Sequence, residues 1–117
     1  RKYPWGNLPP DTTRCNFADY LGMPSIVTMH EDGRTPDGIH DLAGNVMEWT
    51  RDPFVPYSTL RHNPEAAQSN PRRSVRGGCW SSRAGDLLCT VRKGVFPESR
   101  EKNIGFRCVI PVQKPPA

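Results

Sequence analysis

Residues 38–50 read GIHDLAGNVMEWT, a glycine-containing polar turn that runs into an alternating apolar segment. From residue 45 to residue 51 the alternation places Met47 and Trp49 on one face and the Val, Glu and Thr side chains on the other. This pattern predicts a strand over 45–51 that enters the core directly from a tight loop.

Three more short strands are predicted downstream, over residues 74–80, 87–92 and 104–110. The chain has 10 Gly and 13 Pro, which place much of the remainder in turns, chiefly residues 1–44 and 52–71. No segment offers the roughly ten periodic residues that indicate a helix. The predicted fold class is therefore α+β, loop-rich, with short strands in an antiparallel or mixed sheet, little helix and a fraying tail at 111–117.

Length and charge restrict the function classes. A chain of 117 residues is one domain or part of one. The net charge of +4 is modest, and no continuous basic stripe or known nucleic-acid-binding motif is present, so a nucleic-acid partner is not expected. No apolar run approaches the ~18 residues that span a bilayer, so no membrane span is expected.

The predicted core raises a problem of coverage. It contains Tyr3, Trp5, Phe17, Tyr20, Ile39, Leu42, Met47, Trp49, Trp80, Leu87, Leu88, Val91, Ile104, Phe106 and Val109. No amphipathic helix is available to cover the sheet, and a sheet with one bare apolar face would aggregate. We therefore expect a partner segment, either upstream in the native chain or on a second chain.

Four cysteines lie at positions 15, 79, 89 and 108 without a CxxC motif, which argues against a zinc knuckle and a thioredoxin-like centre. Two interpretations remain open at this point. An even count in a small loop-rich chain favours one or two disulfides in an oxidising compartment, whereas the alternative is free, buried thiols.

Four sequence blocks in order carry a family resemblance. They are YPWGN at 3–7, the stretch at 38–50 quoted above, VRGGCW at 75–80 and NIGFRCV at 103–109. Together they resemble the formylglycine-generating-enzyme-like, or sulfatase-modifying-factor, family. The resemblance implies a C-type-lectin-like fold, with residues 1–117 forming the carboxy-terminal part of a single domain whose amino-terminal half is absent. In an oxidising, exported setting, the resemblance pairs Cys89 and Cys108 with cysteines of that absent half.

The stretch at 38–50 also suggests a cation site. Asp41, Asn45 and Glu48 supply three hard oxygen side chains, and Gly44 permits a bend that turns carbonyls inward, as Ca²⁺ requires. An EF-hand is excluded, because Leu42 stands where that motif needs glycine. The alternative is a turn in which Asp41 and Asn45 cap the backbone and Glu48 pairs with an arginine.

The resemblance assigns calcium to specific residues. A structural calcium is implied at Asp41, Ala43, Asn45 and Glu48. A second, more loosely mapped site is implied at Asn16, the carbonyl of Phe17 and an acidic residue near Glu31 or Asp32.

Catalysis is where the chain departs from the resemblance. The family's oxidases bind Cu(I) through two cysteines five positions apart after the Gly-Gly of the third block, and residues 79–89 contain no such pair, so copper is not expected. Cys79 stands where the family commonly has an active-site serine. It is a weak candidate for a reactive thiol activated by Arg76 or Arg83, against a small buried side chain or a partner for Cys15.

The resulting expectation is a non-copper module of this family that serves as a calcium-stabilised binding or structural domain in a secreted, periplasmic or cell-surface assembly with other protein subunits. Its expected ligand contacts are Trp80, Ser81, Ser82, Arg83 and Arg92. The alternative is an enzyme, either a divergent formylglycine-generating oxidase or the substrate-binding part of an iron-dependent sulfoxide synthase. The missing copper-binding cysteine pair favours the reading without enzymatic activity.

Overall fold

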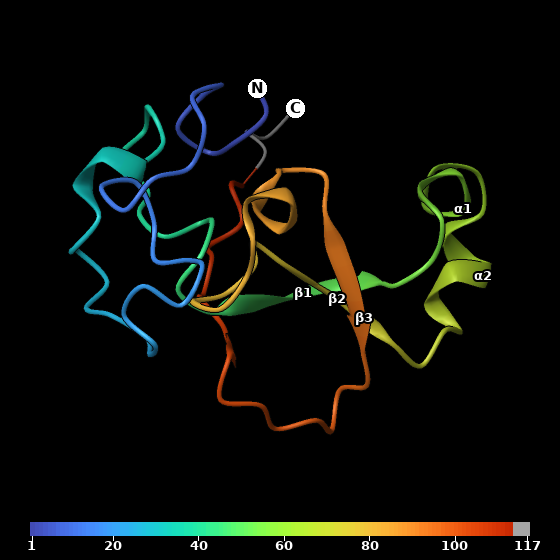
Figure 1. The fold of residues 1–117 in the computed structure, drawn as a ribbon. Helices are drawn as coiled ribbons and strands as arrows, with labels where there is room; N and C mark the ends of the chain where they lie inside the picture. Colours follow the sequence, from blue (N-terminus) through green and yellow to red (C-terminus); the bar gives the residue numbers. More distant parts are fainter. Residues whose placement is uncertain (114–117) are drawn as a thin grey trace.

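The computed structural model describes residues 1–113 and contains one four-stranded mixed sheet in the order β3-β2-β1-β4 (Figure 1). The strands are β1 (Met47–Pro53), β2 (Arg73–Arg76), β3 (Arg92–Val95) and β4 (Ile104–Gly105). β2 pairs antiparallel with both β1 and β3, whereas β4 runs parallel to β1. The strand predicted from the opening stretch is therefore a central strand, and the sheet has the mixed form that the sequence allows.

Three of the predicted segments differ from the structure. Residues 52–71, predicted as a loop, contain α1 (Tyr57–His62) and α2 (Pro64–Gln68). The signal for α2 is local, because Asn63 caps it by accepting a hydrogen bond from Ala66 N at 3.3 Å and Pro64 occupies the first turn. Both helices are too short to show the periodicity on which the prediction relied.

The strand predicted over 87–92 is also wrong. Residues Ala84–Leu87 form a 3-10 helix, and strand pairing begins only at Arg92. Leu87 is buried at the end of that helix. The apolar residues that follow it do not alternate between the two faces of a sheet. A second 3-10 helix spans Glu31–Gly33 in the first half of the chain.

The core consists of two clusters that meet near β1. Cys15, Ala43 and Leu87 form the first, packed by Tyr3, Trp5 and Phe17, and Met47, Val75 and Cys79 form the second. Of the predicted core residues, Tyr20 and Ile39 are exposed, together with most of the segment after β4. Because few large side chains are fully buried, loop hydrogen bonds hold much of the fold together.

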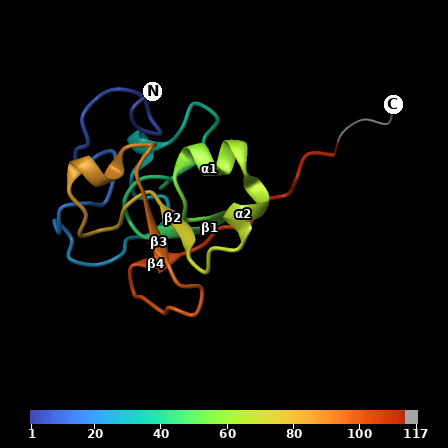
Figure 2. The same cartoon turned by 90° about the vertical axis from the view of Figure 1, so that its right-hand side faces the viewer.

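The segment after β4 is the largest departure from the predicted core. Only residues 104–105 of the predicted strand 104–110 pair with β1, and residues 106–113 leave the body of the fold (Figure 2). Phe106 is 76% exposed and Val109 is 81% exposed. The predicted fraying of 111–117 falls partly outside the described residues. This apolar stretch is exposed among the described residues, and the partner segment expected from the sequence stays a prediction.

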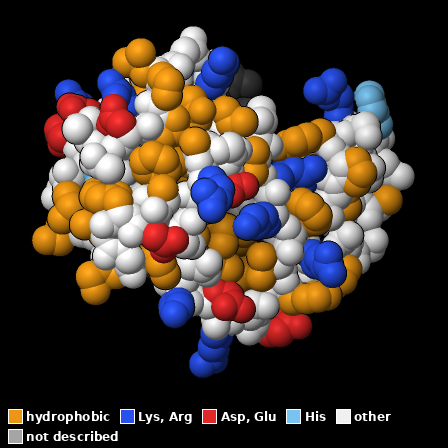
Figure 3. Space-filling view, viewed as in Figure 1, with side chains coloured by type: hydrophobic (Ala, Val, Ile, Leu, Met, Phe, Trp, Pro, Cys, Tyr) orange, Lys and Arg blue, Asp and Glu red, His pale blue; other side chains and the backbone are white. Residues whose placement is uncertain are grey.

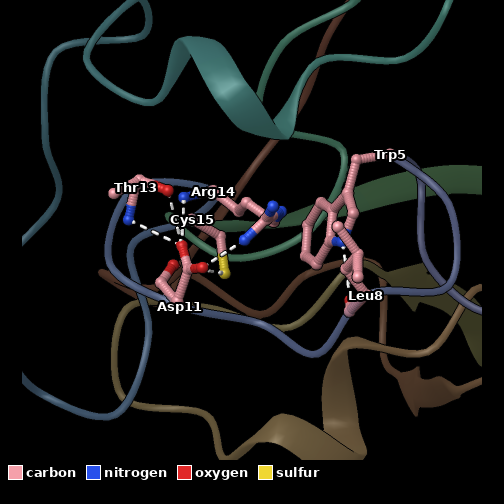
Figure 4. A network of polar contacts seen from close by, with 6 residues as sticks. All are labelled: Trp5, Leu8, Asp11, Thr13, Arg14 and Cys15. Carbon is pink, nitrogen blue, oxygen red and sulfur yellow. Dashed lines mark hydrogen bonds and ion pairs between the residues drawn. The ribbon is translucent and has the colours of Figure 1, made fainter.

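The carboxylate of Asp11 orders the turn at residues 11–14 (Figure 4). Asp11 Oδ1 accepts hydrogen bonds from Thr13 N at 2.9 Å, Thr13 Oγ1 at 2.6 Å and Arg14 N at 3.1 Å, while Oδ2 pairs with Arg14. The backbone N–H of Cys15 donates to Asp11 O at 3.1 Å, which delivers Cys15 into the core. The Tyr3-Pro4-Trp5 block is closed separately by backbone hydrogen bonds between Tyr3 and Gly6, at 2.9 and 3.1 Å, so both backbone and side-chain bonds order this loop.

Within residues 1–113, no helix is long and apolar enough to cross a membrane. All four cysteines fall in this range and all are free, Cys15 and Cys79 buried and Cys89 and Cys108 exposed. Cys15 and Cys79 belong to different core clusters, so the structure does not join them.

Candidate functional site

Three distant segments meet at a glycine junction, which we define as Asn16, residues 42–45 and residues 77–80. Gly44 N donates to Gly77 O at 2.7 Å, Asn45 N to Asn16 O at 2.9 Å, and Trp80 N to Asn45 O at 2.8 Å. A Cβ on Gly44 would lie 2.5 Å from Asn16 O, and one on Gly77 would lie 2.5 Å from Leu42 O. Only glycine therefore allows these backbones to approach. The junction places the oxygen-rich loop beside Cys79.

The carboxamide of Asn45 is the polar centre of this junction. Its Oδ1 accepts hydrogen bonds from Ser25 N at 2.8 Å and Asn16 Nδ2 at 3.2 Å, and its Nδ2 donates to Ser25 O at 3.3 Å. Asn16 Nδ2 also donates to Met23 O at 2.9 Å. The side chains of Asn45 and Asn16 therefore bond to each other and to the loop around Ser25. The sequence did not indicate that this loop belongs to the site.

Asp41 and Glu48 converge on a cation supplied by the chain itself. The Arg107 guanidinium pairs with Glu48 through Nε and through an Nη2 to Oε2 bond of 2.8 Å, and Nη2 also donates to Asp41 O at 3.2 Å. This is the alternative left open above, in which Glu48 pairs with an arginine. Sequence reasoning did not identify which arginine, because β4 brings Arg107 to β1 through a pairing of only two residues.

Asp41 carries an unsatisfied charge in this cluster. Its Oδ2 is buried without a hydrogen-bond partner in the described part of the chain. Burial raises the pKa of Asp41 to about 6, although the positive charges of Arg107 and His40 act to lower it. Asn16 Oδ1 is a second buried oxygen without a partner among residues 1–113. Both of these oxygens can accept a cation, since an unpaired buried acceptor is costly.

The expected calcium ligands are thus brought into one region but not around one point. Asp41 and Glu48 share Arg107, whereas the Asn45 carboxamide faces Asn16 and Ser25. Ala43 is buried in the first core cluster, and Phe17 O accepts a hydrogen bond from Tyr20 N at 3.3 Å. Among residues 1–113, no group of three or more His, Cys, Asp or Glu side chains is arranged to hold a metal. A calcium ion here would draw on Asp41 and Glu48 with backbone carbonyls.

Cys79 sits at the end of the Gly-Gly turn among polar donors. Its Sγ lies 3.2 Å from Ser81 Oγ and 3.7 Å from Asn103 Nδ2, and Ser82 Oγ donates to it at 3.5 Å. Burial acts to raise the pKa of this thiol, but the hydrogen bonds from Ser81, Ser82 and Asn103 outweigh it and leave the pKa lowered. Neither Arg76 nor Arg83 is the cause, so the activation expected from arginine is replaced by neutral donors.

The expected contact residues Trp80, Ser81, Ser82 and Arg83 lie in one segment that is only partly exposed. Trp80 O accepts a hydrogen bond from Asp19 N at 2.9 Å, and Ser82 O accepts one from Ala18 N at 2.8 Å. Ser81 and Arg83 are exposed, whereas Ser82 is buried and donates its hydroxyl to the Cys79 region. The loop at residues 18–19 therefore adjoins this segment, although nothing in its sequence indicated it.

Arg92 has different neighbours from the other expected ligand contacts. Its guanidinium carbon lies 4.0 Å from the Tyr57 ring centroid and 5.1 Å from that of Phe54, and the group also bonds Val55 O. These contacts fasten β3 to the segment that leads into α1. Lys and Arg side chains stand out over the β3 side of the molecule with hydrophobic side chains between them (Figure 3).

Fold and site together define a loop-rich α+β module of the C-type-lectin-like kind, assembled around a glycine junction. Residues 1–112 match the FGE-sulfatase family, described as the sulfatase-modifying factor enzyme 1-like domain, and the chain belongs to this family. The resemblance drawn from the four sequence blocks is thereby confirmed.

Proteins similar in sequence to this chain carry different functional names. The chain is 38% identical over 78 residues to a Chlamydia caviae protein named serine/threonine-protein kinase pkn1, which covers 62% of this chain and 13% of that protein. It is 30% identical over 116 residues to hercynine oxygenase of Mycolicibacterium thermoresistibile, covering 92% of this chain and 26% of the relative. It is 30% identical over 127 residues to formylglycine-generating enzyme of Streptomyces coelicolor, covering 92% and 40%.

One solved structure reports on the fold alone. Treponema denticola variable protein 1 aligns with a TM-score of 0.67 at 24% identity, over 80% of this chain and 34% of that one. The chain thus spans well under half the length of each of these relatives.

Proposed function

We propose that this chain is a non-copper module of the FGE-sulfatase family that works as a calcium-stabilised binding or structural domain in a secreted, periplasmic or surface assembly. The observation that carries the non-copper part is the environment of Cys79, whose neighbours are hydroxyl and carboxamide groups. Cu(I) sites in proteins rely on soft sulfur ligands, and the segment from Cys79 to Cys89 offers no second thiolate at the required spacing.

The calcium part of the proposal rests on Asp41. Its buried Oδ2 lacks a partner among the described residues, and its carbonyl and Glu48 already gather around a positive group. Calcium bound there would supply a fixed double charge that ties the loop to β1. The Arg107 side chain is 37% exposed, and calcium binding at Glu48 would require Arg107 to release that carboxylate, so Arg107 would compete with the ion.

The binding part of the proposal uses the surface of Trp80, Ser81 and Arg83 with residues 18–19. A rigid junction beneath a short exposed loop is a common arrangement for ligand contact. Arg92 contributes to this role indirectly, since its aromatic contacts hold β3 in place.

Thermal melts of the protein in EGTA and in 2 different free calcium concentrations test the proposal. At a calcium concentration about 100 times the Kd, the expected stabilisation is about 2.7 kcal/mol. Asp41→Asn should abolish the shift, while Asp86→Asn, on the exposed 3-10 turn, should keep it. Identical melts with and without calcium in the unsubstituted protein would remove the calcium part.

A second function, oxidation of a substrate thiol, is favoured by one observation. The pKa of Cys79 is lowered despite its burial, which is the state expected of a reactive thiol. Incubation with a cysteine-containing sulfatase peptide, copper, dioxygen and a thiol reductant distinguishes the two. In the enzyme reaction, dioxygen is reduced to water while the peptide cysteine becomes an aldehyde and releases its sulfur as sulfide, so an aldehyde detected by mass spectrometry would establish the enzyme and overturn the binding module.

A further inference from the structure

An open groove of about 420 Å³ lies between β1 and the segment that follows β4. Leu42, Trp49 and Val109 supply its apolar lining, and Arg51, Arg76 and Arg107 stand around it. It is separate from the Trp80–Arg83 surface. Its size suits one or two side chains of a partner rather than a large cofactor.

The groove exists because two neighbouring strands differ in length. β1 has seven residues, Met47–Pro53, yet β4 pairs only with Met47 and Glu48. Beyond Glu48, β1 is bordered by β2 on one edge, and on the other edge no described residue continues the sheet. Backbone donors and acceptors on that edge are a template for an added strand.

The positive charges around the groove are not all paired with carboxylates of the described part of the chain. Arg107 is neutralised by Glu48, whereas neither Arg51 nor Arg76 forms an ion pair among residues 1–113. Arg76 instead donates to Cys89 O at 3.1 Å and Tyr57 Oη at 2.9 Å, which leaves further N–H donors of its guanidinium available. A carboxylate arriving here would meet two cations beside an apolar floor.

We propose that this groove receives an extended polypeptide segment, added as a strand along β1, that places an aliphatic side chain against Trp49 and Val109 and a carboxylate between Arg51 and Arg76. The inference rests on the proposed function, because it supplies the partner that a module of a larger assembly needs. The exposed Phe106, Val109 and Ile110 extend the same apolar surface along the incoming strand.

Charge argues against the apolar stretch of a second copy, residues 104–112, as the occupant, because this stretch contains Arg107 and no acidic residue. Such a segment would bring a further positive charge to Arg51 and Arg76, where like charges are costly. A free small acid would fill the cavity but would leave the β1 edge unpaired.

Amide hydrogen exchange and titration of the 117-residue protein with a ten-residue peptide of alternating Val and Glu test this inference. We expect saturable binding, slower exchange of the amides at residues 49–53, and affinity at least about tenfold lower for the matching Val and Gln peptide. Arg51→Gln should weaken binding of the Val-Glu peptide by a similar factor, whereas Arg61→Gln, at an exposed position of α1 that does not line the groove, should not.

Several outcomes would overturn the inference. These are equal affinity for the Gln peptide, unchanged exchange at 49–53, competition by hexanoate at the same concentration as the peptide, or concentration-dependent dimerisation that protects the same amides. None of these outcomes alters the calcium melts, so failure here is separable from failure of the proposed function.

Discussion

Arg107 and Glu48 are 59 positions apart in the sequence, yet the guanidinium of one bonds both carboxylate oxygens of the other. The pair closes the only parallel contact in the described sheet, that between β1 and β4. Because β4 contributes two residues to the ladder, this pair carries an unusual share of its attachment.

Removing either member should loosen β4. We expect Arg107→Ala and Glu48→Gln each to destabilise the fold, with a coupling of about 1 to 2 kcal/mol in a double-mutant cycle measured by urea unfolding. The Glu48 side chain is only 15% exposed, which places the pair above ordinary surface ion pairs. Purely additive effects of the two changes would show that the contact is not stabilising.

The glycine junction predicts a sharp contrast between two substitutions. Gly44→Ala would force a Cβ into Asn16 O at a backbone φ of +76°, so we expect a loss of at least about 3 kcal/mol or failure to fold. Gly85→Ala is the control, since no atom lies within 4 Å of its added Cβ. Equal stability of the two variants by thermal melt would contradict the close approach described for the junction.

The contribution of His30 to stability should fall at mildly acidic pH, whereas Asp41, whose pKa burial raises to about 6, contributes in the opposite direction as the pH falls. Burial lowers the pKa of His30, and its Nδ1 has no partner among residues 1–113. At this residue the unfolded chain therefore takes up a proton more readily than the folded one, so the His30 contribution is full above about pH 6.5 and is lost as the pH falls through the folded-state pKa. His30→Gln should reduce this slope in urea titrations at pH 5 to 7. A wild-type slope that persists in the variant would assign it to another group.

The four cysteines should differ in reactivity toward iodoacetamide, measured by mass spectrometry at neutral pH. Cys89 and Cys108 are exposed and should react first. Burial raises the pKa of Cys15 to about 12, so it should be the slowest. Cys79 should follow the exposed pair, and Ser81→Ala should slow it further because a donor that lowers its pKa is lost. Faster reaction of Cys15 than of Cys79 would be inconsistent with these environments.

Replacing Arg92 tests whether its contacts with Phe54 and Tyr57 stabilise the fold. Arg92→Lys should cost about 1 kcal/mol because an ammonium cannot lie over both Phe54 and Tyr57 as a planar guanidinium does. Arg83→Lys, at an exposed position without such rings, should be close to neutral. If Arg92→Lys leaves the unfolding midpoint unchanged, its aromatic contacts are not stabilising.

Particular residues show which parts of the fold could be predicted from the sequence. The alternation around Met47 and Trp49 located the central strand, because a strand in the core repeats with period two. The helices at 57–68 were missed since they are short, although the Asn63-Pro64 cap was a readable signal. Phe106 and Val109 were assigned to the core on apolar character, which does not determine what covers a residue.

The site was accessible to sequence reasoning only in part. Asp41 and Glu48 were selected for their oxygen chemistry, and both contact Arg107, Asp41 through its backbone carbonyl and Glu48 through its carboxylate. Arg107 follows a strand of only two residues, which no local pattern reveals. Cys79 was identified by position, while its neutral donors from Ser82 and Asn103 depend on tertiary folding.

The glycine junction also bears on how such a module tolerates change. Its hydrogen bonds join Asn16, residues 42–45 and residues 77–80 by backbone atoms, whose geometry is the same for most side chains. The exposed loop that leaves the junction after Trp80 is anchored at its base by these bonds and by its buried residues Ser82 and Leu87. Lengthening that loop or rewriting its exposed positions should therefore give new contact surfaces on an unchanged foundation, which makes this position the natural place to graft foreign peptides.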